Sequence, residues 1–410
     1  MGKKLLYLIP QNPYPATDGG KIGLYYPIKY LKDYFELIVF FRANDYDSGK
    51  LTQNHFKSMN IKSDFFVKDI KDKKINILKN LIESVPFKWS KYYDKKILSK
   101  LHSIIFKENI KYLLVSHPHV FIYAIQLKKF FPEIKVVFRE HNIEADLYSQ
   151  YIKLSKNPIH KLIALWQYKK ALHSEKKFWR ISDKICFISD SDYKTALKEE
   201  KGILNKSYVV YDGFETKGDV ELIKERETKN IVFSGKLDIL QNSFNMNWFI
   251  KTVWEPFVSS GEGKDYRLYI TGNSIEKVEK FLKINRTELE KLNIIPLGFI
   301  ENLDEFLEKQ SYFVSPTIIG SGIRLKVLHA MASGMITLLT KLDYETVKDF
   351  KDMENVVLFR NYEEFSSKIK KLQESDKLRN YISYNAYNLI KNKLNWDNYA
   401  KKMSEIILSL

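Results

Sequence analysis

The sequence predicts an α/β protein built from two domains of similar type. Short apolar segments alternate with helical stretches along most of the chain, which is the pattern of parallel strands joined by crossover helices. Two of the strand-to-helix connections are rich in glycine, one near residue 19 and one near residue 321. The pattern starts again after a charged segment, residues 216–229, and 410 residues are enough for two to three domains.

The composition excludes several classes of protein. Hydrophobic residues make up 44% of the chain and charged residues 29%, as in ordered globular proteins. The one cysteine, Cys186, excludes an internal disulfide and a cysteine-based metal cluster, and it fits a reducing, cytoplasmic compartment. No apolar run reaches the roughly 18 residues of a transmembrane helix. The apolar start of the chain is predicted to be a buried strand rather than a signal peptide.

The first half of the chain contains the predicted strands 4–9, 36–42, 112–116, 136–138, 184–188 and 208–211, with helices predicted over 22–34 and 159–179. A turn-rich loop follows the first strand and carries Gly19 and Gly20. Because glycine has no side chain, this loop lets the backbone come close to a ligand at a helix start.

Polar residues follow two of these strands directly. His117 and His119 come after the third strand, and His141, Asn142 and Glu144 come after the fourth. The carboxyl ends of parallel strands meet at the edge where α/β proteins place their sites, so we expect these side chains to face a site. The two histidines of the third strand could also bind a metal, but no nearby carboxylate or cysteine completes a ligand set.

The second half repeats the alternation, with predicted strands over 230–234, 266–271, 294–300, 312–315 and 336–340 and helices over 244–257, 303–310, 323–333 and 371–410. The strand 312–315 leads into Gly320-Ser321-Gly322 and then a helix, an arrangement that gathers free N–H groups and favours phosphate. Ser321 is the expected N-cap. Lys326 and His329 share one face of the helix. An ordinary buried crossover helix with a long lysine would give the same short pattern.

The segment from Pro316 to Gly334 reads Gly-Ser-Gly-Ile-Arg-Leu-Lys-Val-Leu-x-Ala-Met-Ala-x-Gly over its last fifteen residues, and it resembles the donor-site signature of glycosyltransferase family 4. The resemblance implies a retaining, nucleotide-sugar-dependent enzyme of GT-B architecture, with two facing Rossmann-like domains and a deep interdomain cleft. It implies an acceptor-side domain over 1–212, a nucleotide-sugar-binding domain over 213–390, and a helix over 391–410 that crosses back to the first domain.

The resemblance also implies roles for individual residues. Lys326 and Arg324 would stabilise the leaving pyrophosphate, and His141 would contact the transferred sugar or support its reaction centre. The donor would be bound by Gly19, Gly20, Lys236, Gly298, Gly320, Ser321, Gly322 and His329. His117, Asn142 and Glu144 would line the cleft. The chain departs from the usual pattern at His329 and Ser321, where many relatives have glutamate, and at Asn242, where they often have lysine.

The activity implied is hexosyl transfer from a UDP- or GDP-linked sugar to a lipid-linked or glycan acceptor in bacterial surface glycan synthesis, with no metal or other cofactor. The implied location is the cytoplasm, at the inner face of the cell membrane. Three alternatives stay open. Asp45-Tyr46-Asp47 has the form of a metal-binding motif of GT-A transferases. A non-catalytic GT-B subunit or glycan-binding partner would explain His329, and an epimerase would share the fold.

The net charge of +17 lies in the first half, because residues 1–210 hold 38 basic and 21 acidic residues. This asymmetry indicates a polyanionic partner, although a solvated lysine-rich surface would look the same. Residues 62–111 interleave lysines with aromatic residues. Such a segment can lie in a membrane interface or form helices packed on the sheet. We recognise no nucleic-acid-binding module, so we expect an anionic membrane and no nucleic acid.

Overall fold

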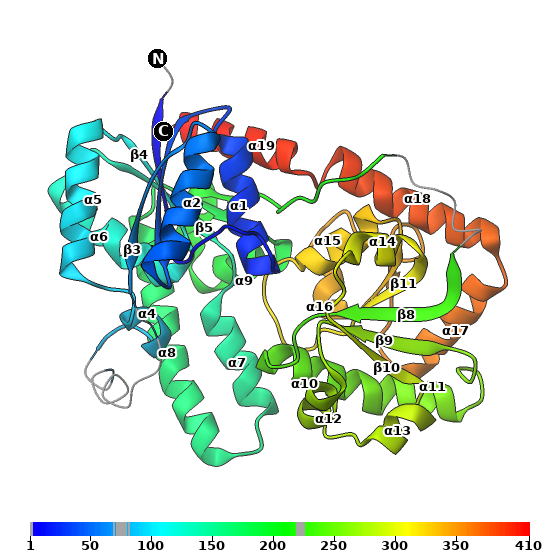
Figure 1. Ribbon diagram of the computed structural model, residues 1–410. Helices are drawn as coiled ribbons and strands as arrows, with labels where there is room; N and C mark the ends of the chain where they lie inside the picture. Colours follow the sequence, from blue (N-terminus) through cyan, green and yellow to red (C-terminus); the bar gives the residue numbers. More distant parts are fainter. Residues whose placement is uncertain (1–2, 69, 71–79, 81–82, 219–225) are drawn as a thin grey trace. The chain divides into compact units, whose positions relative to one another are not determined.

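The computed structural model describes residues 3–68, 70, 80, 83–218 and 226–410 (Figure 1). The chain divides into two compact units. Unit 1 comprises Met1–Asp212 and Trp396–Leu410, and unit 2 comprises Gly213–Asn395. Each unit has its own parallel sheet and its own hydrophobic core, which confirms the α/β class. Unit 2 extends to Asn395 rather than to residue 390, because the last helix starts only at Trp396.

The sheet of unit 1 has the strand order β3-β2-β1-β4-β5-β6-β7, with every neighbouring pair parallel. Its strands are β1 (Lys4–Ile9), β2 (Glu36–Ala43), β3 (Lys62–Val67), β4 (Tyr112–Ser116), β5 (Lys135–Glu140), β6 (Lys184–Phe187) and β7 (Ser207–Val209). Alternate residues of β1 face opposite sides, and both sets are buried. A strand buried on both faces requires a continuous apolar run, which is why Leu-Leu-Tyr-Leu-Ile stands at the centre of this sheet.

The helices of unit 1 are α1 (Gly19–Leu31), α2 (Tyr46–Ser58), α4 (Phe87–Ser90), α5 (Lys95–Glu108), α6 (Phe121–Phe130), α7 (Glu144–Leu154), α8 (Pro158–Ile181), α9 (Asp190–Glu199) and α19 (Trp396–Leu408), with 3-10 turns at Pro118–Val120 and Lys201–Lys206. Side-chain oxygens of Asp18, Asp45, Asp94 and Asn157 cap four of them, which explains where they start. The last helix packs on α1, where Trp396 stacks on Tyr26 at 5.5 Å between ring centroids.

The sheet of unit 2 has the order β10-β9-β8-β11-β12-β13 and is also parallel throughout. Its strands are β8 (Glu227–Ser234), β9 (Arg267–Thr271), β10 (Ile294–Gly298), β11 (Gln310–Ser315), β12 (Ile336–Leu339) and β13 (Val357–Leu358). In both sheets the strand order reverses direction beside the first strand of the unit, between β1 and β4 and between β8 and β11. The carboxyl ends of strands at such a point form the usual binding edge of an open α/β sheet.

The helices of unit 2 are α10 (Leu240–Phe249), α11 (Glu255–Ser259), α12 (Ile275–Leu282), α13 (Arg286–Lys291), α14 (Leu303–Glu308), α15 (Leu325–Ala332), α16 (Lys341–Tyr344), α17 (Tyr362–Gln373) and α18 (Asp376–Asn392), with a π-helical turn at Ile250–Trp254. Aromatic rings from α10, the π turn, α11 and α17 meet in the core: Phe249, Trp254, Phe257 and Phe365. Their large buried surfaces hold these helices on the sheet.

Several element boundaries differ from the sequence predictions. Gly19 and Gly20 form the first turn of α1 rather than a loop before it, because Asp18 caps the helix by accepting from Lys21 N. The predicted helix 323–333 starts at Leu325, and the charged segment 216–229 already contains the start of β8. Asp45 is the N-cap of α2 and accepts from Ser48 N, which gives this carboxylate a structural role. In the basic segment 62–111, α5 packs on the sheet through Ile97, Leu101 and Ile105, whereas residues 69, 71–79 and 81–82 lie outside the described part.

Candidate functional site

The loop between β11 and α15 in unit 2 is held by a buried asparagine. Asn245 of α10 is 5% exposed, and its Oδ1 accepts from the N–H groups of Ile318 and Ile319 at 3.0 and 2.9 Å. Its Nδ2 donates to Ile319 O at 3.0 Å. Because buried backbone groups need partners, this one side chain specifies the path of the loop. The sequence analysis missed this role of Asn245, although a polar residue between Phe244 and Met246 in a predicted helix was a possible signal.

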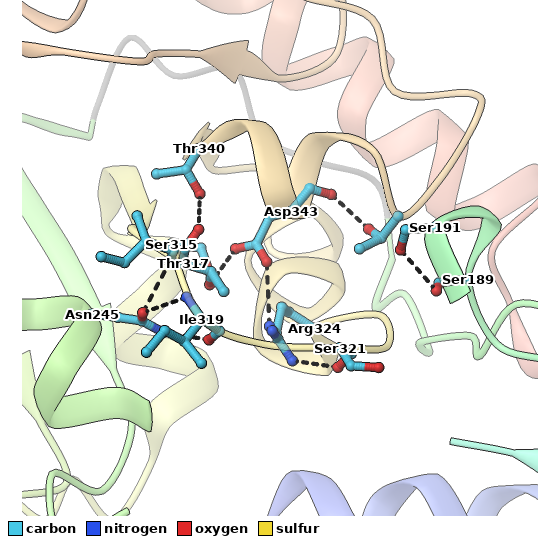
Figure 2. A network of polar contacts seen from close by, with 12 residues as sticks. Ser189, Ser191, Asn245, Ser315, Thr317, Ile319, Ser321, Arg324, Thr340 and Asp343 are labelled. Atoms are coloured by element: carbon cyan, nitrogen blue, oxygen red, sulfur yellow. Dashed lines mark hydrogen bonds and ion pairs between the residues drawn. The ribbon is translucent and has the colours of Figure 1, made fainter. Parts of the chain in front are cut away.

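Arg324 and Asp343 join the same loop to α16 (Figure 2). Asp343 is 1% exposed, and it accepts from Arg324 Nε at 3.2 Å and from Thr317 Oγ1 at 2.7 Å. Arg324 Nη1 also donates to Ser321 O at 2.7 Å. α15 begins at Leu325, so Arg324 is the residue at its N-cap position. The prediction that Ser321 caps this helix is wrong. The guanidinium therefore links the loop, through Ser321 O, to Asp343 of α16.

The glycines of the loop serve its own geometry. A Cβ atom at Gly320 would lie 1.5 Å from Arg324 Nη2, so only glycine leaves room for the guanidinium. Gly322 has φ +77°, in the left-handed region that favours glycine. At Gly320 the Arg324 side chain therefore occupies the space that a Cβ atom would take. The conformation of the loop is therefore specified by contacts within unit 2.

Lys326 lies in the first turn of α15, where the Arg324 side chain makes no capping hydrogen bond. It is half-buried, and its Nζ lies 4.3 Å from the centroid of the Phe233 ring in β8. Burial lowers the pKa of Lys326 from its usual 10.5 to about 8, with Asp343 opposing this shift and Arg324 adding to it. A cation held at a helix N-terminus against an aromatic ring is suited to pair with phosphate.

His329 lies little more than one turn into α15 and has a carboxylate partner that the sequence did not indicate. Its Nε2–H donates to Asp304 Oδ1 of α14 at 2.7 Å, because an ionised carboxylate can only accept. Its ring stacks on Phe214 at 4.5 Å. Asp304 also pairs with Lys217, and both partners hold its pKa well below the usual value, His329 most strongly. The position where many relatives have a glutamate thus holds an imidazole paired with a carboxylate from α14. No sequence signal joined positions 25 residues apart.

Lys236 and Gly298 follow β8 and end β10, on the same edge of this sheet. Lys236 is exposed, and the loop that carries it is fixed by two asparagines. Asn242 Nδ2 donates to Lys236 O at 2.9 Å, and Asn273 Nδ2 donates to Gly235 O at 2.7 Å. Gly298 has φ +68°, which favours glycine there. The amide of Asn242, at the position of a lysine in many relatives, therefore has a structural use.

The carboxyl edge of the unit 1 sheet is organised by a fully buried arginine. Arg139, at the end of β5, pairs with Asp212 and donates through Nη1 to Gly23 O of α1 at 2.8 Å. Tyr7 of β1 and Ser116 of β4 share a hydrogen bond of 2.7 Å beside it. Despite burial, the Asp212 carboxylate and the neighbouring tyrosines raise the pKa of Arg139, so it is always charged. Arg139 lies two residues before His141 in the sequence, whereas its partner Asp212 is 73 residues further along the chain.

Arg139 also determines the protonation of His141. Its Nη1 donates to His141 Nε2 at 2.6 Å, and since a guanidinium cannot accept, His141 carries its proton on Nδ1. Burial, Arg139, His117 and His119 lower the pKa of His141 well below 6.5. The ring stacks on His117 at 3.7 Å, and His117 has φ +71°. His141 is therefore a neutral ring in a fixed orientation, and its Nε2 is already used and cannot act as a general base.

The acidic residues near this edge are mostly structural. Glu175 of α8 accepts from Glu144 N at 2.7 Å and from Ala145 N at 3.3 Å, which caps α7. Glu140 accepts from Trp179 Nε1 at 2.8 Å. Burial raises the pKa of both carboxyls well above the usual value. Glu144 is nearly buried and lies 3.8 Å from Lys88 Nζ, whereas its neighbour Asn142 is half-buried.

The predicted site residues fall into one group in each unit. Unit 2 gathers the loop glycines, Ser321, Arg324 and Lys326, with Lys236, Gly298 and His329 on the same unit. Unit 1 gathers Gly19 and Gly20, which follow β1, with His117 after β4 and His141, Asn142 and Glu144 after β5. Within the described parts of the chain, no three His, Cys, Asp or Glu side chains gather to hold a metal ion. Among the described helices, none is both long and apolar enough to cross a membrane.

Comparison with known proteins agrees with this geometry. Residues 228–375 match the family model of glycosyl transferases group 1. An uncharacterised 44.6 kDa protein in the cps region of Klebsiella pneumoniae is 22% identical over 410 residues, covering 97% of each chain. The structure of Anabaena Alr3699/HepE in complex with UDP and glucose is 12% identical, covers all of both chains and has a TM-score of 0.67. The lipopolysaccharide outer core galactosyltransferase WaaB is 11% identical over 99% of each chain, with a TM-score of 0.61.

These likenesses confirm the predicted GT-B fold, and they exclude the GT-A fold that Asp45-Tyr46-Asp47 suggested. The chain has the GT-B fold of two Rossmann-like domains, and its match to the model of glycosyl transferases group 1 lies within unit 2.

Proposed function

We propose that this protein is a retaining glycosyltransferase that moves a hexosyl group from a UDP- or GDP-linked sugar to a lipid-linked or glycan acceptor in bacterial surface glycan synthesis. The observation that carries the proposal is the pre-organised loop of unit 2, with Lys326 at the start of α15. The UDP bound to the Anabaena structure supports a nucleotide-sugar donor. The cps region of the Klebsiella relative supports a role in a surface glycan.

Sugar transfer from such a donor requires the leaving diphosphate to be stabilised as its charge develops. The start of α15, which no side chain caps, and the Lys326 cation supply positive potential without reorganisation, because Asn245, Arg324 and Asp343 already hold the loop. In the free protein, burial makes the charged form of Lys326 less favourable and lowers its pKa. An adjacent phosphate would stabilise the charged ammonium group and raise this pKa again.

We assign to His141 contact with the transferred sugar. Its fixed neutral tautomer favours the role of hydrogen-bond partner over that of base. Retention of configuration needs no protein nucleophile if the acceptor attacks from the side of the leaving group, where the departing phosphate takes the proton. We therefore propose a reaction without a covalent enzyme intermediate and without a metal, at the cytoplasmic face of the cell membrane.

The proposal is tested by incubating the protein with a panel of UDP- and GDP-sugars and measuring thermal stabilisation and slow donor hydrolysis. We expect one donor to raise the melting temperature and to be hydrolysed. The Lys326→Ala variant should lose roughly 2–4 kcal/mol of transition-state stabilisation, as on removal of one charged donor. Binding of no donor in the panel, or normal hydrolysis by the variant, would contradict the proposal.

A non-catalytic GT-B subunit is the second candidate. Asn242 favours it, since this position of the loop offers an amide used by the backbone rather than a second free cation. The same panel separates the two functions, because a binding subunit would hydrolyse no donor and release no altered nucleotide sugar. Release of a new nucleotide sugar would identify an epimerase.

A further inference from the structure

The helical hairpin of α7 and α8 in unit 1 ends in an exposed apolar tip, which we define as residues 153–166. Figure 1 shows the connection between the two helices at the lower end of the view, away from the sheet of this unit. Ile159 is 67% exposed, Leu162 is 69% and Ile163 is 52%, while Leu154 and Leu165 are each 40% exposed. Exposed aliphatic side chains in such a cluster mark a contact surface.

The apolar residues of the tip lie on the face of α8 that points away from the core of unit 1. Ile159, Leu162, Ile163 and Trp166 are spaced i, i+3, i+4, i+7, so they share one face. The side chains of α8 buried against the protein are instead small or polar in this region, namely Ala164, Gln167 and Ala171. The C-terminal half of α8 buries Phe178 and Trp179 in the usual way. The tip is therefore built to put aliphatic residues outside.

The charges around the tip have one sign. From residue 147 to residue 174 the chain has no Asp or Glu and contains Lys153, Lys156, Lys161, Lys169 and Lys170. The first three of these belong to the tip and are exposed. Beyond the aliphatic residues come Trp166 and Tyr168, and Lys170 Nζ lies 3.9 Å from the Trp166 ring. Aliphatic residues interleaved with long lysines and flanked by aromatic rings are the composition of a helix that lies in a membrane interface, because lysine side chains can extend to the headgroups.

We propose that the α7–α8 tip is the surface through which this protein docks on an anionic lipid bilayer, with its aliphatic side chains at the acyl boundary and its lysines at the headgroups. A helix advances 1.5 Å per residue, so the first eight residues of α8 reach roughly 12 Å, which matches the interfacial depth of about 5–10 Å. A second copy of this chain is a poor occupant, since its own excess charge of +17 would repel the lysines of the tip. This inference gives the membrane contact of the proposed function a location, which differs from the segment 62–111 that the sequence indicated.

The test is flotation with phosphatidylcholine vesicles and with vesicles in which about a third of the lipid is phosphatidylglycerol. It needs no sugar transfer, so its failure is distinguishable from failure of the proposed reaction. We expect wild type to float with the anionic vesicles only. Leu162→Ser/Ile163→Ser should weaken this binding at least about tenfold, because two exposed aliphatic side chains no longer enter the interface. Lys156→Glu/Lys161→Glu should weaken it further, since each basic residue near the surface contributes roughly fivefold.

Matched controls lie elsewhere on the same unit. Phe106→Ser/Phe130→Ser removes side chains that are 75% and 60% exposed, and Lys96→Glu/Lys129→Glu makes the same charge change on α5 and α6. Both controls should keep most of the binding. Equal flotation of wild type and the Leu162→Ser/Ile163→Ser variant would overturn the proposal. A second result would also overturn it: no flotation of wild type, together with a dimer in sedimentation that the Leu162→Ser/Ile163→Ser variant does not form. The tip would then bind a second copy of the chain.

Discussion

Replacement of Lys326 by methionine tests whether this lysine serves function or stability. Lys326 is half-buried on α15 with its ammonium over Phe233, and its pKa is lowered to about 8. Methionine has a similar length and no charge, so it should fill the same space. The variant removes the one feature of the side chain that is costly in the folded protein and valuable to a diphosphate.

The size of the effect follows from the pKa. A lysine whose pKa falls from 10.5 to about 8 gives up about 3 kcal/mol of preference for its charged form, at 1.36 kcal/mol for each factor of ten. The contact with Phe233 offsets about 1 kcal/mol of this cost. We therefore expect Lys326→Met to raise the free energy of unfolding by about 2 kcal/mol at pH 7. Turnover should fall by roughly 30- to 1,000-fold, the equivalent of about 2–4 kcal/mol.

The assay is urea unfolding followed across pH, together with donor turnover. Below pH 8 the wild-type lysine is charged in both states, and the burial cost is present in full. Between pH 8 and 10.5 the unfolded chain binds more protons, so wild-type stability rises with pH and approaches that of the variant. Donor affinity should fall over the same range as the ammonium group is lost. Lys280→Met, an exposed lysine over Phe281, is the control and should change neither quantity much. A less stable Lys326→Met protein with normal turnover would refute the reasoning.

Three further predictions concern His329, the Arg139–Asp212 pair and the dependence on a metal. His329→Glu alone should not tighten donor binding, because the new carboxylate would face Asp304 Oδ1, whereas His329→Glu/Asp304→Asn should tighten it by roughly 1.5–3 kcal/mol, measured as the dissociation constant by calorimetry; equal tightening by the single change would contradict this. Asp212→Ala leaves the buried Arg139 cation unpaired and should cost about 3–5 kcal/mol in urea unfolding, against about 1 kcal/mol or less for Glu354→Ala in an exposed pair. A similar cost for both would show that Arg139 finds another partner. Chelator should leave donor turnover unchanged, and a full loss that magnesium or manganese restores would instead indicate a metal-dependent reaction.

The sequence alone predicted the features that depend on local pattern. The apolar runs of β1 and β11 and the glycine loop before α15 are continuous segments, and strands buried on both faces must be apolar throughout. The carboxyl-edge positions of His117 and His141 followed from the same reasoning, since a parallel strand carries the residue after it to that edge. Helix starts were less accurate. Arg324 rather than Ser321 stands at the N-cap position of α15, and α1 starts at Gly19 after the Asp18 cap rather than at residue 22, because the path of the preceding loop decides where helical backbone begins.

The tertiary structure alone decided which polar side chains meet. Asp304 and His329 are 25 residues apart, Arg139 and Asp212 are 73 apart, and Asn245 holds a loop 73 residues further along the chain. Each pair forms because burial makes an unpaired charge or amide costly, so the fold must supply a partner from whichever element packs nearby. The exposure of the α7–α8 tip was likewise decided by the tertiary structure. Its sequence is that of an ordinary amphipathic helix, and only the packing of Ala164 and Ala171 inward leaves Leu162 and Ile163 outside.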